Sequence, residues 1–236
     1  STAKGDCPAF TGRTEQAENW NGGTAVAYSY NVTVPSDSTV TDPAGRIYRS
    51  QSGTLSQTTT IYADAAAYTA GTYLKRFTTT YEDDGLGYQS NVRPTEIKVE
   101  DSSNTRKTGI SYTTGSVKLP TDVTEYQGST TTVYRHTVTT YNSNTAYSNL
   151  HIFGLPDEVY LYSGAGTATL ISKTAYAYDD AGYFWASGGD NVIQHDLTNY
   201  GDSFITGRAN LSKVTQYSVV SGTASISTQL PTSVRT

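Results

Sequence analysis

The sequence predicts an all-β fold, an elongated antiparallel sheet of stacked β-hairpin repeats with little or no helix. The composition favours strands, because 20 of the 236 residues are Tyr and more than a quarter are Thr or Ser. Many segments alternate aliphatic with polar or aromatic residues, the period of two that is typical of a strand with two faces. No segment carries the apolar stripe at i, i+3, i+4 and i+7 that a long amphipathic helix needs.

Residues 155–182 contain the clearest hairpin. Two alternating runs flank Gly164-Ala165-Gly166, whose glycines can adopt the positive φ values that a tight reversal needs. We expect the tyrosines of both runs to lie on exposed strand faces, where they either cover a thin core or stack on sugars. These tyrosines are Tyr160, Tyr162, Tyr176 and Tyr178.

Two half-motifs recur along the chain and interleave. The first is a Thr-rich run that ends in Tyr and an acidic or turn residue, and the second is a strand that follows Pro. The first ends at Tyr81, Tyr112, Tyr141 and Tyr178; the second begins at Pro94, Pro120, Pro156 and Pro231, with a degenerate copy from Leu211. Proline suits the start of a strand because it has no N–H to donate. A repeat of about 30 residues is typical of stacked units.

The repeats divide the chain into two predicted regions. Residues 1–72 form an N-terminal β region with an irregular lead-in and either one helical turn or an irregular crossing within residues 63–72. Residues 73–236 form the hairpin-repeat region, interrupted by an aromatic insertion at 183–207. This insertion carries a candidate ligand surface for carbohydrate or protein. The surface consists of Tyr183, Phe184 and Trp185.

Three segments together resemble the RHS/YD-repeat family of large secreted bacterial proteins. They are residues 155–159 (Leu-Pro-Asp-Glu-Val), residues 174–182 (Thr-Ala-Tyr-Ala-Tyr-Asp-Asp-Ala-Gly) and residues 208–217, where Ala209 replaces the usual Gly. The resemblance covers residues 73–236 and implies linked β-hairpins wound into a long sheet. Full-length members often form a hollow shell around a toxin. This chain is too short to close a shell and lacks the self-cleaving protease segment, so toxin encapsulation is not inferred.

Composition and motifs argue against several classes of function. The net charge is −5 and no basic cluster exceeds two residues. A protein that binds nucleic acid typically has a larger positively charged surface, so the charge argues against this class. No run approaches the roughly 20 apolar residues of a membrane span. The histidines His136, His151 and His195 have no zinc-like spacing, and no nucleophile elbow or phosphate loop occurs. We therefore expect no enzymatic activity and no cofactor.

Individual polar residues receive ordinary structural interpretations. We expect His136 to point to solvent or to pair across the sheet, and the acidic pairs at 83–84 and 179–180 to form turns rather than Ca²⁺ sites. The sequons place candidate covalent glycans on Asn31 and Asn210. Low charge, many hydroxyl residues, a single Cys and a start at Ser1 favour an exported, extracellular or cell-surface protein.

The end of the repeat region motivates the functional hypothesis. The last Pro-led strand has no return strand after it, and an unpaired strand can be completed by another copy of the protein. Head-to-tail pairing of this kind builds open filaments. The predicted inter-subunit strand consists of Leu230, Pro231, Thr232, Ser233, Val234, Arg235 and Thr236. We expect a non-enzymatic subunit of a bacterial surface filament; the alternatives are a carbohydrate- or protein-binding module and a fragment of a larger RHS-repeat shell protein.

Overall fold

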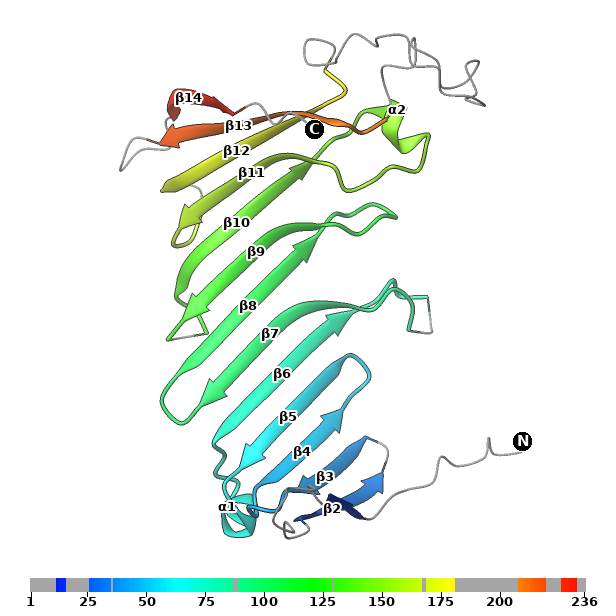
Figure 1. The fold of residues 1–236 in the computed structure, drawn as a ribbon, viewed down its shortest axis with the longest axis vertical. Coiled ribbons are helices and arrows are strands. Elements are labelled where there is room, and N and C mark those ends of the chain that lie inside the picture. The colour runs from blue at the N-terminus through cyan, green and yellow to red at the C-terminus, as the bar shows by residue number, and fades with distance from the viewer. Residues whose placement is uncertain are drawn as a thin grey trace, which may run out of the picture. The chain divides into compact units, whose positions relative to one another are not determined.

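The fold was analysed in a computed structural model, which describes residues 12–15, 26–34, 36–86, 89–128, 130–166, 169–180, 208–219 and 226–232. Antiparallel strands dominate, with two short helices, α1 (Ala65–Ala70) and α2 (Thr145–Ser148) (Figure 1). The strands are β1 (Gly12–Glu15), β2 (Val26–Val34), β3 (Asp37–Thr41), β4 (Ile47–Ser52), β5 (Ser56–Tyr62), β6 (Lys75–Glu82), β7 (Arg93–Asp101), β8 (Thr105–Tyr112), β9 (Pro120–Gln127), β10 (Val133–Tyr141), β11 (Pro156–Ser163), β12 (Leu170–Tyr178), β13 (Leu211–Val219) and β14 (Ile226–Thr232). The predicted all-β antiparallel fold with little helix is confirmed.

The hydrogen-bonding order of the strands is their order in the chain, β1 to β14. The chain divides into two compact units, which we describe separately. Unit 1 comprises residues 1–109 and 126–131, and unit 2 comprises residues 110–125 and 132–236. The sequence-based boundary at residues 72/73 follows the repeat pattern rather than contacts, and it stays a prediction.

The few buried side chains of unit 1 lie near Tyr62, at the end of β5. The Tyr62 ring packs edge-on against Tyr68 of α1, with centroids 5.1 Å apart. Helix α1 begins after Asp64, whose carboxylate accepts the Ala67 N–H at 2.7 Å, and ends at Gly71, which has a positive φ of 73°. Of the two alternatives for residues 63–72, the structure therefore shows the helical turn and not the irregular crossing.

Unit 2 shows how the two half-motifs fit together. The register pairs Tyr141 with Pro156 and Tyr178 with Leu211, each just after a shift in the ladder. The residue after each Tyr donates its N–H to the carbonyl that precedes the returning strand: Asn142 to Leu155 and Asp179 to Asn210, both at 2.9 Å. A bulge and a closing hydrogen bond thus recur at each return.

Each of the other two repeat tyrosines shows one part of this return. In unit 1, Tyr81 pairs with Pro94 after a shift between Thr80 and Tyr81. In unit 2, Thr113, which follows Tyr112, donates its N–H to the Leu119 carbonyl at 2.9 Å. The proline lies opposite the tyrosine at the bulge. The regular hydrogen bonding of the ladder is interrupted there, so the missing N–H of proline removes no regular hydrogen bond.

The predicted hairpin at residues 155–182 is confirmed as β11 and β12. Its turn contains Gly164 at φ 70° and Gly166 at φ 80°.

The strand β14 begins at Ile226 rather than at Leu230. It pairs with β13, from Thr232 opposite Val214 to Ile226 opposite Val219. The run before Pro231 and the Pro-led segment therefore belong to one strand.

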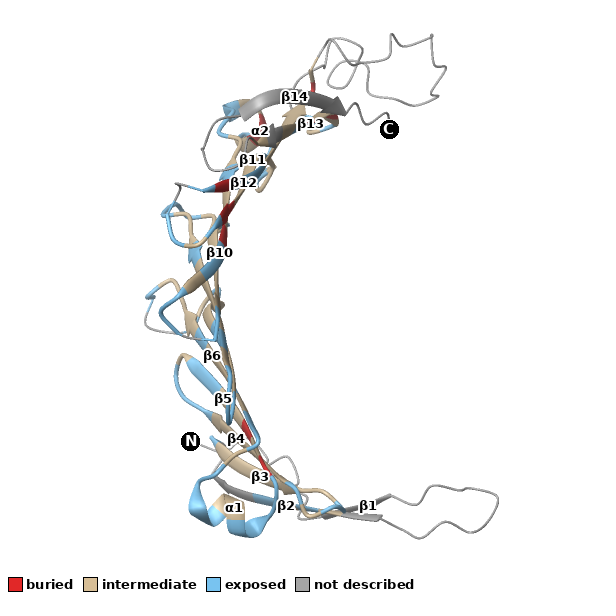
Figure 2. Ribbon diagram, turned by 90° about the vertical axis from the view of Figure 1, so that its left-hand side faces the viewer, coloured by how far each residue is buried: buried red, intermediate tan, exposed pale blue. Residues whose placement is uncertain are grey.

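Burial is sparse in both units. Among the described side chains, the buried apolar residues are Tyr62, Tyr147, Tyr162 and Leu170, and no large side chain falls below 2% exposure. Figure 2 shows that most described strand residues in each unit are of intermediate burial. Neighbouring side chains on the same face therefore provide most of the shielding from water.

Candidate functional site

The densest group of interacting side chains lies on one face of β10 to β13 in unit 2. We call it the tyrosine–lysine cluster, and it consists of His136, Glu158, Tyr160, Tyr162, Lys173 and Tyr217. The register explains its assembly, because His136 pairs with Tyr162, Tyr160 with Lys173, and Lys173 with Tyr217. Cross-strand partners point to the same face of a sheet.

Lys173 is the centre of the cluster. Its Nζ lies 4.9 Å from the centroid of the Tyr160 ring and 5.1 Å from that of Tyr217, and it forms an ion pair with Glu158. Glu158 also accepts a hydrogen bond from the Tyr160 hydroxyl. The ammonium is thus shared between two aromatic faces and one carboxylate.

The charges of this cluster are stabilised by one another. Burial acts to lower the pKa of Lys173, but hydrogen bonds to Glu158 and Tyr160 outweigh it and raise that pKa above its ordinary value. Burial acts to raise the pKa of Glu158, but the hydrogen bonds from Lys173 and Tyr160 and the charge of Lys173 together outweigh burial, so that pKa is lowered. The arrangement holds an ion pair across strands and does not supply a neutral amine for nucleophilic chemistry.

The aromatic part of the cluster decides between the two alternatives for His136 and corrects the expectation for the tyrosines. His136 is buried, and its ring stacks on Tyr162 with centroids 4.8 Å apart, so it pairs across the sheet and does not point to solvent. Its Nδ1 lies 3.1 Å from the Gly164 carbonyl oxygen. Tyr162 is buried and Tyr160 and Tyr176 are half-buried, so these tyrosines are not exposed as predicted.

Asp179 follows β12 and is buried, with a positive φ of 52°. Its carboxylate accepts three backbone hydrogen bonds, from the N–H groups of Arg208 and Ala209 at 2.9 Å and from Asn210 at 3.0 Å. The turn interpretation is correct but incomplete, because this carboxylate also fixes the start of β13. The acidic residue directly after a repeat tyrosine is the sequence signal for this role.

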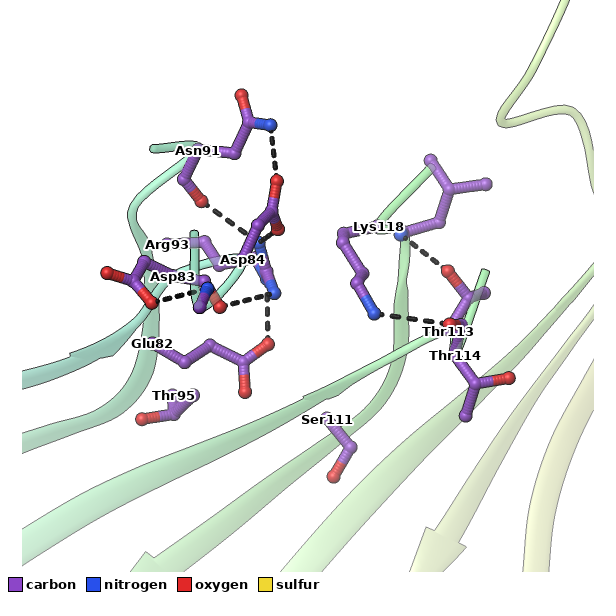
Figure 3. Close-up of polar contacts among 12 residues, drawn as sticks. Glu82, Asp83, Asp84, Asn91, Arg93, Thr95, Ser111, Thr113, Thr114 and Lys118 are labelled. Atoms are coloured by element: carbon purple, nitrogen blue, oxygen red, sulfur yellow. Dashed lines mark hydrogen bonds and ion pairs between the residues drawn. The ribbon is translucent and has the colours of Figure 1, made fainter. Parts of the chain in front are cut away.

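A second polar group closes the turn between β6 and β7 in unit 1 (Figure 3). The Arg93 guanidinium bonds Glu82 Oε1 and Asp84 Oδ1, each at 2.7 Å. These hydrogen bonds raise the pKa of Arg93. Asp83 accepts the Gly85 N–H at 2.9 Å, as expected for a turn.

Figure 3 also shows the return between β8 and β9 in unit 2, where the Thr113 hydroxyl accepts the Leu119 N–H at 3.0 Å. The Lys118 Nζ lies 3.3 Å from the Thr114 carbonyl oxygen. Both groups shown in the figure therefore shape turns with local partners.

The structure describes only some of the sequence-predicted site residues. Asn31 is exposed in β2, and Asn210 is exposed directly before β13. The candidate ligand surface lies outside the described residues: Tyr183, Phe184 and Trp185. Of the predicted inter-subunit strand, Leu230, Pro231 and Thr232 belong to β14, and Ser233, Val234, Arg235 and Thr236 lie outside the described residues.

A metal-binding group and a helix that could cross a membrane are both absent from the part of the chain that the structure describes. Within the described ranges, no group of three or more His, Cys, Asp or Glu residues is arranged to hold a metal ion. In that same part of the chain, neither helix has the length and apolar character needed to cross a membrane.

Comparison with known proteins finds no protein-family model and no curated protein that matches the chain. The resemblance to RHS/YD repeats therefore stays a prediction.

Proposed function

We propose that this chain is a non-enzymatic structural protein of an extracellular bacterial assembly, a subunit of a surface filament that grows by pairing of sheet edges. The observation that supports this function is the strand order, because every strand pairs with its neighbours in the chain. A sheet ordered in this way extends by adding strands at its edges, without rearrangement of its interior.

The strand β14 is the proposed donor of the contact. Within the described residues, its neighbour in the sheet is β13, and the pairing spans Val214 to Val219 of that strand. The opposite edge of β14 can pair with a strand of another copy by β-augmentation. Pro231 lacks an N–H, so the contact runs over residues 226–230.

The sparse burial also favours a structural role. A sheet whose described side chains are mostly half-buried gains stability when further strands or another surface shield its faces and edges. The Lys173–Glu158 ion pair fits this role, because it ties neighbouring strands together and leaves both groups charged.

A segment of a larger RHS/YD-like shell is the alternative, and a chain-ordered sheet would serve it equally well. The two functions differ in the source of the next strand. In a filament, the strand comes from a second copy; in a shell, it comes from the same polypeptide.

Electron microscopy of the native material and of the purified chain tests the filament. We expect fibres that disappear when residues 223–236 are deleted, because the deletion removes β14. A synthetic peptide with the sequence of β14 should shorten the fibres, since it competes for the accepting edge.

The matched control is a peptide of the same composition in scrambled order. Fibres that survive the deletion unchanged would exclude donation of β14. A purified chain that stays monomeric at all concentrations, although native material forms closed particles, would favour the shell.

A further inference from the structure

Unit 1 contains a hollow of about 380 Å³ that none of the features above uses. It lies where β6 begins, β7 ends, β8 begins and β9 ends. The lining residues that matter here are Lys75, Val99, Asp101, Asn104, Arg106 and Gln127. Its volume falls at the lower end of the range of small-ligand pockets, about 300–1,000 Å³.

The strand register places the lining side chains on one face. Lys75 pairs with Asp101, and Phe77 pairs with Val99, which pairs in turn with Arg106. Phe77 is 38% exposed on this same face, beside Lys75 and Val99. An accessible aromatic ring therefore lies next to the Lys75 ammonium and on the same face of the sheet as Arg106.

The two cations of the hollow are available to a ligand. The Lys75 ammonium lies over the Phe77 ring at 5.0 Å, and no described residue engages it or the Arg106 guanidinium in a hydrogen bond or a salt bridge. Three other cations of unit 1, by contrast, are engaged in ion pairs: Arg49 bonds Asp37, Arg93 bonds Glu82 and Asp84, and Lys107 pairs with Glu96.

Asp101 limits the charge that the hollow can accept. Its carboxylate accepts the N–H groups of Ser103 at 2.9 Å and Asn104 at 2.7 Å. These bonds lower its pKa, and Lys75 adds to the effect, so Asp101 stays negative. Two positive groups and one negative group favour a ligand with a single negative charge over a phosphate dianion.

We propose that this hollow binds a uronic acid residue of an acidic glycan. The carboxylate pairs with Lys75 and Arg106, and the hydroxyl groups bond the amides of Asn104 and Gln127 and the free lone pairs of Asp101. The C–H face of the sugar ring packs on Phe77. A neutral sugar lacks the group that the cations require, and a simple anion lacks the ring and hydroxyl groups.

The proposal is tested by titration of the full chain with two probes, an oligogalacturonate and a glucuronate-containing tetrasaccharide, followed by NMR and calorimetry. We expect at least one of them to bind, with chemical-shift changes at the lining residues. Carboxyl-reduced probes should bind at least about tenfold more weakly, because a charge-assisted hydrogen bond contributes more than a neutral one. Added salt should weaken binding.

Two variants test the assignment. Lys75→Gln and Arg106→Gln should each weaken binding about tenfold, whereas Arg46→Gln, an exposed arginine elsewhere in unit 1, should leave it unchanged. Circular dichroism checks that all three variants retain the fold. No binding of either probe, equal binding by the variants, or equally strong binding of acetate would overturn the proposal; none of these results bears on the filament.

Discussion

Asp179 connects two segments that the sequence separates by about 30 residues, through three hydrogen bonds from backbone N–H groups to its buried carboxylate. A buried carboxylate with three donors is stable because each donor replaces a water molecule, and losing the charge leaves those donors poorly paired. Single residues of this kind hold the ends of strands whose faces bury little apolar surface.

Replacing Asp179 with Asn is expected to lower the free energy of unfolding of unit 2 by about 2 kcal/mol, since the amide removes the charge and can accept through one oxygen only. Asn tolerates the positive φ of this position, so the variant tests the hydrogen bonds rather than the backbone. Urea unfolding followed by circular dichroism measures the change. Asp157→Asn, at an exposed position of β11, is the control and should change stability little.

The raised pKa of Tyr147 predicts how the stability of unit 2 changes at alkaline pH. Burial, with a contribution from Asp179, raises the pKa of Tyr147 to about 12, from an ordinary 10.0. Its hydroxyl donates to the Tyr178 carbonyl at 3.2 Å, which requires the protonated phenol. A pKa raised by folding stabilises the protein below the unfolded value, and this contribution disappears as the pH rises from about 10 to about 12.

We therefore expect the free energy of unfolding to fall across that interval, and to fall less in Tyr147→Phe. Unfolding curves at several pH values, with phenolate absorbance recorded in parallel, provide the measurement. Tyr134→Phe is the control because Tyr134 is 56% exposed. An identical pH dependence in the Tyr147 variant and the native chain would show that Tyr147 does not contribute.

At the scale of elements, the register of the β11–β12 hairpin depends on its turn and on a shift in its ladder. The β11–β12 turn needs Gly164, whose φ is 70°, and a Cβ added there would meet no atom within 4 Å. Its cost would therefore come from the backbone conformation alone. This turn and the shift between Leu161 and Tyr162 set the register of the two strands.

Gly164→Ala is expected to destabilise unit 2 by about 1–2 kcal/mol, the cost of a left-handed conformation for an L-residue. Gly115→Ala is the matched control, because Gly115 also has open space for a Cβ but no positive φ. Thermal unfolding of both variants compares them. A loss of stability as large at Gly115 would indicate that lost chain flexibility, and not the left-handed backbone, causes the effect.

At the scale of the whole molecule, the chain-ordered sheet predicts that stability depends on association. If copies pair at their edges, the folded state gains free energy with concentration, by roughly 1.4 kcal/mol for each tenfold increase once pairing is saturating. The melting temperature should then rise by about 3–6 °C over that interval. Calorimetry at several concentrations measures it, and a constant melting temperature would argue against edge pairing.

Some features of this protein are determined by the sequence alone. Neighbouring residues determine the strand positions, the return after each repeat tyrosine, the β11–β12 turn and the short helix α1. Alternation, Pro at strand starts, Gly at positive φ and Asp64 as a cap each act over a few residues. The sequence reveals the first three directly, whereas it leaves residues 63–72 as a helical turn or an irregular crossing.

The tertiary structure alone decided which side chains share a face. Tyr160 and Tyr176 follow the same alternation, yet the register places Tyr160 opposite Lys173 and Tyr176 opposite Val214, on the other face. The burial of His136, the partners of Asp179 and the hollow beside Lys75 depend likewise on pairing between distant strands. The physical reason is that a register shift of one residue moves a side chain to the other face, and bulges and turns between strands set that shift.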